Sequence, residues 1–318
     1  MSVKRIVNLP TVAGWIGTAG GAFAAHTIVI DLPVGPRYHA IWCSANPGAA
    51  KLGTDLFGEM RLKVNGKTQR TMFADELNKL NILNGVLYAS RGIATAATEF
   101  HIPIWLAEPW RNNPASADGM AWGTGDVGTF QLEVDIKAYA GAAAGLTLPN
   151  FKAIIDNSLI NVNGVFRPTP LGVITKWLVF QLPIAQLSSY HDFTGLPKRE
   201  FYQSIHLIDS NIDEFEVKVD NTIIRQDTVT GNNAKLYHRE MIPNPTATAT
   251  PATVAADMPT RGIVDIVFDE DDRLDSALPM EDGRGNKVQD FNLRIKSGAG
   301  GAAPRNIKTI IQLAGPAE

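Results

Sequence analysis

The feature that most constrains this chain of 318 residues is an internal repeat, in which one series of strand-like segments occurs twice. Five pairs of segments match in unbroken order, each at an offset of about 160 residues. The matched positions are Leu9 with Leu182, Tyr38 with Tyr202, Val64 with Val219, Phe130 with Phe291, and Ile154 with Ile310. The repeat predicts two copies of one β fold. One large all-β domain with similar strands is the alternative.

Alternation of apolar and polar residues indicates that most of these segments are half-buried strands. In residues 129–136 (TFQLEVDI), the apolar side chains share one face, and Gln131, Glu133 and Asp135 share the other. The predicted strands of the first half cover residues 4–9, 26–32, 37–43, 60–64, 67–72, 100–105, 129–136 and 151–156. Those of the second half cover residues 176–182, 202–209, 214–219, 222–226, 263–268, 291–295 and 307–313.

A turn and a helix follow at equivalent places in the two halves. Asn65-Gly66 and Asp220-Asn221 separate paired strands, and both dipeptides tolerate the positive φ of a tight hairpin. Residues 73–83 (FADELNKLNIL) have apolar side chains at helical spacing and predict a helix. A second helix is predicted over residues 232–241.

About eight strands in about 150 residues suit a jelly roll. We therefore expect an all-β fold of two tandem eight-stranded jelly rolls, with one or two short helices in each. The N-terminal jelly roll should cover residues 1–160 and the C-terminal one residues 173–318, with residues 161–172 as a linker.

Composition narrows the range of partners. Charged residues make up 19 % of the chain and the formal net charge is −3, so no basic footprint for nucleic acid is present. A surface with few charges suggests cover by partner subunits. Cys43 is the only cysteine, which excludes an intrachain disulfide. Residues 11–30 are almost uncharged, but Pro10 and several glycines argue against a membrane helix or signal peptide.

Catalytic motifs are missing from the sequence. No two of the six histidines have metal-ligand spacing, and neither a GxSxG elbow nor a phosphate-binding loop occurs. Gly123, Gly125 and Gly128 spell GxGxxG, but a strand follows them where a dinucleotide site needs a helix. We therefore predict no catalytic or cofactor-binding residues and a protein that is not an enzyme.

Two groups of residues remain as candidate sites. Trp105, Trp110 and Trp122 crowd one predicted loop, where tryptophan would either stack on sugars or be buried at a subunit interface. The interface is the favoured interpretation. The acidic run DEDDRLD offers Asp269, Asp271 and Asp272 as calcium ligands between subunits, although a solvated acidic loop is the simpler interpretation.

The first 85 residues or so resemble the N-terminal domain of the corticovirus-type coat proteins. The resemblance rests on a basic strand ending in Leu9-Pro10, a strand ending in Leu32-Pro33, and the segments GPRYHAIW (35–42) and LKVNGK (62–67). Such proteins are double jelly-roll major capsid proteins of tailless icosahedral bacteriophages with an internal membrane.

The resemblance implies a structural protein of the virion that passes through the host cytoplasm before assembly. Three copies would form a trimer whose six jelly rolls make a pseudo-hexagonal block, and such blocks tile an icosahedral shell. Expected partners are other copies of the chain, other capsid proteins such as a vertex protein, and a membrane vesicle beneath the shell, with no direct nucleic-acid contact. The alternative function is a secreted, lectin-like carbohydrate-binding protein with two β-sandwich modules.

Overall fold

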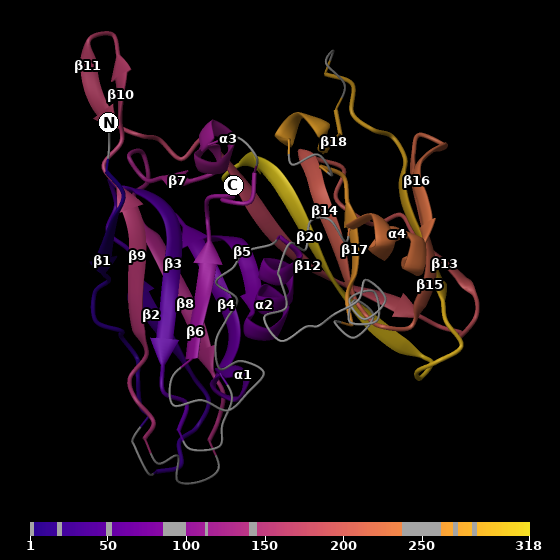
Figure 1. The fold of residues 1–318 in the computed structure, drawn as a ribbon, viewed down its shortest axis with the longest axis horizontal. Helices are drawn as coiled ribbons and strands as arrows, with labels where there is room; N and C mark the ends of the chain where they lie inside the picture. Colours follow the sequence, from indigo (N-terminus) through magenta and orange to yellow (C-terminus); the bar gives the residue numbers. More distant parts are fainter. Residues whose placement is uncertain are drawn as a thin grey trace, which may run out of the picture. The chain divides into compact units, whose positions relative to one another are not determined.

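The computed structural model describes residues 3–17, 21–48, 53–84, 100–111, 114–139, 145–236, 262–269, 273–281 and 285–318 (Figure 1). The chain divides into two compact units. Unit 1 comprises Met1–Lys176 with Gly315–Glu318, and unit 2 comprises Trp177–Ala314. The division falls just beyond the stretch expected to be a linker, residues 161–172.

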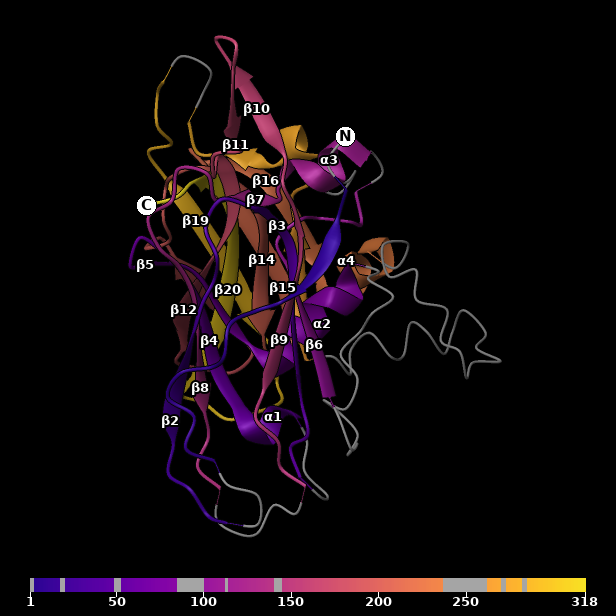
Figure 2. The same cartoon turned by 90° about the vertical axis from the view of Figure 1, so that its left-hand side faces the viewer.

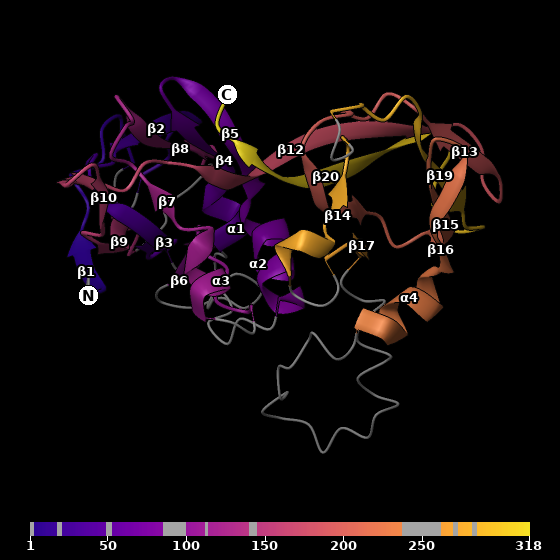
Figure 3. The same cartoon turned by 90° about the horizontal axis from the view of Figure 1, so that it is seen from above.

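Unit 1 consists of two antiparallel sheets of four main strands, ordered β1-β9-β3-β6 and β5-β4-β8-β2. Figure 3 shows the two sheets as separate layers. Their strands are β1 (Arg5–Asn8), β2 (His26–Asp31), β3 (Arg37–Ala45), β4 (Phe57–Val64), β5 (Lys67–Phe73), β6 (Phe100–Trp105), β8 (Phe130–Ile136) and β9 (Asn150–Asp156). The short strand β7 (Trp122–Gly123) also pairs with β3. Apolar side chains of β8 fill the space between the sheets, whereas its polar side chains lie on the outside.

Unit 2 repeats this arrangement strand for strand. Its sheets are ordered β12-β20-β14-β17 and β16-β15-β19-β13, and a short β18 (Leu278–Pro279) pairs with β14 as β7 does with β3. The strands are β12 (Val173–Ile184), β13 (Tyr190–Phe193), β14 (Phe201–Ile208), β15 (Ile212–Val219), β16 (Thr222–Thr228), β17 (Val264–Val267), β19 (Phe291–Ser297) and β20 (Arg305–Pro316). The expected pair of tandem eight-stranded jelly rolls is confirmed.

Strand register confirms the repeat at the level of single residues. Val64 faces Phe130 in unit 1, and Val219 faces Phe291 in unit 2. The hydroxyl of Tyr38 donates to the carbonyl of Pro33 at 2.6 Å, and Tyr202 donates to Pro197 at the same distance. Each tyrosine also packs against the matching phenylalanine, with ring centroids 5.1 and 4.9 Å apart.

One of the five sequence matches is shifted by two residues. Tyr38 faces Ile155 and Tyr202 faces Leu313, with an irregularity in register directly after each tyrosine. The structural counterpart of Ile154 is therefore Gln312, and its match to Ile310 was wrong. An alternating strand looks the same after a shift of two residues, so its pattern alone does not fix the alignment.

The helix expected over residues 73–83 is confirmed as α2 (Ala74–Leu83), which buries Leu77 and Leu80. The second expected helix corresponds to α4 (Val229–Leu236), and residues 237–241 lie outside the described part of the chain. Sequence did not predict α1 (Gly53–Leu56), α3 (Pro114–Gly119) or a 3₁₀ turn over Leu274–Ser276. None of the described helices is long and apolar enough to cross a membrane.

Part of the expected linker is a β-hairpin. Strands β10 (Leu159–Val162) and β11 (Val165–Pro168) pair only with each other among the described strands. The hairpin projects past the end of β9 in two perpendicular views (Figures 1 and 2).

Candidate assembly surfaces

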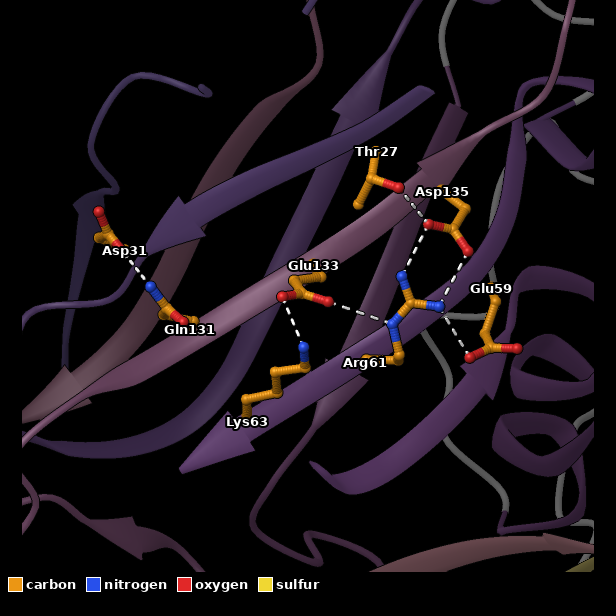
Figure 4. A network of polar contacts seen from close by, with 8 residues as sticks. All are labelled: Thr27, Asp31, Glu59, Arg61, Lys63, Gln131, Glu133 and Asp135. Atoms are coloured by element: carbon orange, nitrogen blue, oxygen red, sulfur yellow. Dashed lines mark hydrogen bonds and ion pairs between the residues drawn. The ribbon is translucent and has the colours of Figure 1, made fainter. Parts of the chain in front are cut away.

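A network of ion pairs covers the outer face of β4 and β8 in unit 1 (Figure 4). Arg61 donates through both terminal nitrogens to the two oxygens of Asp135, at 2.8 and 2.9 Å, and also reaches Glu133 and Glu59. Lys63 donates to Glu133 at 2.6 Å. Two opposed strands thus carry opposite charges at neighbouring positions, which stabilises their pairing.

The network is extended toward β2. Thr27 donates to Asp135 at 2.7 Å, and Gln131 donates to Asp31 at the same distance. The hydrogen bond from Lys63 lowers the pKa of the Glu133 carboxyl. Partial burial would raise the pKa of Asp135, but hydrogen bonds from Arg61 and Thr27 outweigh it and the pKa is lowered. Both carboxyls therefore carry a charge at neutral pH.

On the corresponding face of unit 2, the central pair has its charges exchanged between strands. Glu216 faces Arg294, where Arg61 faces Glu133 in unit 1. Lys296 donates to Glu214 at 2.7 Å, and this bond raises the pKa of Lys296. The strand at the centre of the face is therefore acidic in unit 1 and basic in unit 2, so the two repeats present different surfaces.

A buried cluster holds the base of the β10–β11 hairpin. Asp156, the last residue of β9, accepts hydrogen bonds from Arg37 at 2.8 Å, His39 at 2.7 Å and the backbone of Ser158 at 2.8 Å. Asp156 and His39 are both almost fully buried. Burial lowers the pKa of the His39 imidazole despite the nearby carboxylate. For Asp156, burial acts to raise the pKa, but the bonds from Arg37 and His39 prevail and lower it.

Two glycines of the GxGxxG pattern, Gly123 and Gly125, lie in the same region, whereas Gly128 donates to Asn65 at the β4–β5 turn. A β-carbon on Gly123 would lie 2.3 Å from the carbonyl oxygen of Pro170, and one on Gly125 would lie 2.5 Å from that of Pro168. The backbone of Gly125 donates to the carbonyl of Thr169 at 2.9 Å. At these two positions only glycine leaves room for the backbone of residues 168–170, which follows the hairpin. This packing explains the two glycines without a bound nucleotide.

The three candidate tryptophans lie in different environments. Trp122 is fully buried in unit 1, where it contacts Phe130 and the guanidinium of Arg70. Trp105 is half-buried and meets Trp42 edge to face at 6.1 Å, and Trp110 is also half-buried. Only Trp105 and Trp110 are exposed enough to contact a partner, and for these two the interface role stays a prediction.

Solved structures with the same fold are viral capsid proteins. The crystal structure of the major capsid protein P2 from bacteriophage PM2 matches with a TM-score of 0.71 and 16 % identity, over 99 % of this chain and 98 % of that one. The major capsid protein of STIV, Sulfolobus Turreted Icosahedral Virus, matches with a TM-score of 0.60 and 14 % identity, over 98 % and 96 %. The PBCV-1 virus capsid matches with a TM-score of 0.58 and 8 % identity, over 99 % of this chain and 94 % of that one.

Residues 18–150 match the family model of the viral coat protein P2 N-terminal domain. The chain therefore has the double jelly-roll fold of these capsid proteins, and its first jelly roll is similar to the N-terminal domain of a viral coat protein. No curated protein matches this chain. The resemblance seen in the sequence is thereby confirmed. The lectin-like alternative is not supported, because the matching family and folds are those of coat proteins.

The acidic candidates for a calcium site are only partly described. Asp269 is buried, with only 6 % of its surface exposed, whereas Asp271 and Asp272 lie outside the described residues. Within the described part of the chain, no group of three or more histidine, cysteine or acidic side chains could hold a metal ion. The calcium site therefore stays a prediction.

One chain of hydrogen bonds in unit 2 was missed by sequence reasoning. Ser204 contacts His206 at 2.7 Å, and the other ring nitrogen of His206 contacts Asp265 at 2.6 Å. The order resembles that of a catalytic triad, but all three side chains are buried and Ser204 also donates to Gln312 at 3.1 Å. The chain therefore links β14 to β17 and β20. Spacing i, i+2 on one strand could have indicated the first pair, but not Asp265.

Proposed function

We propose that the protein is the major capsid protein of a tailless icosahedral virus and acts as a homotrimeric, pseudo-hexagonal capsomer. One observation carries the proposal: two jelly rolls with the same strand order stand in one chain. Three copies then supply six nearly equivalent barrels, enough for a six-sided block with three-fold symmetry. A block of this kind can tile a flat facet while each copy makes only a few kinds of contact.

The differences between the two repeats support a trimer over a true hexamer. Exchanged charges at Arg61–Glu133 and Glu216–Arg294 make the outer faces chemically distinct. In a closed ring of three, barrels of the two kinds alternate, so each contact between copies joins unit 1 of one copy to unit 2 of the next. Such a heterologous contact tolerates, and benefits from, different surfaces on its two sides.

Further partners follow from the resemblance to internal-membrane phages. We expect a separate vertex protein at the five-fold positions, where a six-sided block does not fit, and a membrane vesicle beneath the shell. Nucleic acid should make no direct contact, because the net charge of the chain is −3.

Native mass spectrometry and negative-stain electron microscopy of the purified full chain test the proposal. We expect a mass of three chains and particles of hexagonal outline with three-fold symmetry. A chain that stays monomeric over the micromolar range and in the presence of assembly salts, or that forms rings of another order, would contradict it.

A further inference from the structure

The β10–β11 hairpin exposes more apolar surface than an isolated ribbon can sustain. Phe166 is 67 % exposed, Leu159 55 %, Val165 53 % and Val162 40 %. Two-stranded ribbons are at best marginally stable in water without a packed face. Large apolar side chains gathered on a projecting element indicate a contact surface.

Both faces of the hairpin are apolar. Cross-strand partners lie on the same face, so Leu159 and Phe166 occupy one side, while Val162 and Val165 occupy the other. A ribbon that merely lay on a surface would need one apolar face. Two such faces indicate that the hairpin inserts between surfaces.

The hairpin is shaped before it meets a partner. Asn163 and Gly164 form its turn with φ of 51° and 82°, and Asn161 accepts a hydrogen bond from the backbone of Gly164 at 2.8 Å. At the other end, the backbone and hydroxyl of Thr169 donate to the carbonyl of Ser158 at 3.2 and 3.0 Å. An element fixed at both ends loses little conformational entropy on binding.

A protein partner fits the hairpin better than a lipid bilayer does. Its tip is Asn163-Gly164, and Arg167 is exposed on its second strand, so insertion into hydrocarbon would bury polar groups. The outer edges of its two strands have no described strand beside them. Lipid offers no hydrogen bonds to such edges, whereas another strand does.

Unit 2 carries a surface of matching character. Strand β16 ends its sheet among the described strands, and it exposes Ile223 and Ile224 by nearly half. Exposed apolar edge strands promote association unless they are covered. In the proposed trimer, unit 1 of one copy meets unit 2 of the next, so each contact joins a unit that bears a hairpin to a unit that bears a β16 edge.

We propose that the β10–β11 hairpin is an arm that inserts against unit 2 of a neighbouring copy, with the β16 edge as part of the receiving surface. The inference rests on the proposed trimer and adds which element joins the copies. In a ring of three copies, each of the three arms would occupy one of the three receiving edges. No arm or edge would then be left free to bind a fourth copy.

A pair of hairpin variants of the full chain tests the arm. The double substitution V165S/F166S removes two exposed apolar groups, so the folded monomer should keep its melting temperature while trimer formation weakens about tenfold or more. The matched variant V165I/F166L keeps the apolar character and should form trimers like the wild type. Sedimentation equilibrium measures both.

Photo-cross-linking identifies the receiving surface. Benzoylphenylalanine in place of Phe166, in a mixture of isotopically light and heavy chains, should give mixed cross-links to residues 222–228 of the other copy. Cross-links confined to one chain, or transfer to lipid when anionic vesicles are added, would overturn the inference. A wild type that forms no trimer contradicts the proposed function itself. A wild-type trimer that V165S/F166S leaves intact contradicts only the arm.

Discussion

Asn65 and Asp220 hold equivalent hairpin turns by the same two hydrogen bonds, one in each jelly roll. Asn65 accepts from the backbone nitrogens of Gly128 and Thr129, and Asp220 accepts from those of Gln289 and Asp290. Both residues have a positive φ, 50° and 46°. Each turn is thereby attached to the start of the next strand in its sheet, so this device was retained in both repeats while the surrounding residues changed.

Replacing Asn65 by alanine should therefore destabilise unit 1. The variant leaves two backbone donors without their acceptor and puts alanine, which tolerates positive φ less well than asparagine, at φ of 50°, with an expected loss of about 2 kcal/mol in the free energy of unfolding. Urea denaturation measures it. N65D is the matched control, because an aspartate accepts the two equivalent hydrogen bonds in unit 2. Its free energy of unfolding should fall much less. An equal loss for both variants would contradict the role assigned to the turn.

Replacing Arg61 by methionine should destabilise the outer face of unit 1 at neutral pH. Glu133 and Asp135 would lose their cation, and we expect a loss of about 1–2 kcal/mol because the network is partly exposed to solvent. R61K keeps the positive charge but not the bidentate geometry, so its free energy of unfolding should lie between those of the wild type and R61M. Added salt should narrow the differences, as measured by urea denaturation at low and high ionic strength.

The same substitution has a pH dependence of known sign. The pKa of Glu133 and Asp135 is lowered in the folded chain, so their contribution to stability is present above the unfolded values of about 4 and is lost as pH falls through the folded values. The gap between wild type and R61M should be widest near pH 7 and should shrink below about pH 4. A gap that is constant with pH would show that lost packing causes the effect.

His39 should make the protein less stable in mild acid. Burial lowers the pKa of its imidazole, so the unfolded chain binds a proton more readily, and stability falls as pH drops below the unfolded value of about 6.5. H39Q keeps a neutral donor near Asp156 and should flatten the melting temperature between pH 7 and pH 5. An unchanged slope would assign the acid sensitivity to other groups.

Alanine at Gly123 or Gly125 should disturb the base of the hairpin. Each new β-carbon would clash with backbone, which cannot turn away as a side chain can, and we expect a cost of about 1–3 kcal/mol. G119A is a suitable control, since no atom lies within 4 Å of its β-carbon position. Calorimetry of the three variants checks this. Equal melting temperatures would show that the loop moves aside freely.

The sequence predicted the fold well because the repeat is carried by local signals. Alternation marks each strand, and Asn65-Gly66 marks its turn, so order and pairing could be inferred without distant contacts. The two-residue error at Ile154 arose because alternation has a period of two. Asn163-Gly164 between valines carries the same hairpin signal, but its position between two repeats favoured the interpretation as a linker.

The candidate surfaces were harder to predict, because they depend on residues brought together by pairing. The polar face of β8 followed from alternation, whereas the contact of Arg61 with Asp135 depends on the register between β4 and β8. Burial of Trp122 likewise depends on tertiary structure, which brings the guanidinium of Arg70, distant in sequence, over its ring. The residue types in the sequence thus indicated aromatic and charged surfaces. Whether a given residue is buried or exposed, however, depends on the tertiary structure.

Cys43, the single cysteine, lies fully buried within β3, and burial raises the pKa of its thiol. A maleimide added to the folded protein should therefore leave the natural chain unlabelled. A cysteine introduced at Asn163 would then be the one thiol within reach of the reagent. Comparing the labelling of this cysteine in intact and in disrupted particles would show whether the tip of the hairpin faces the outside or the inside of the proposed shell.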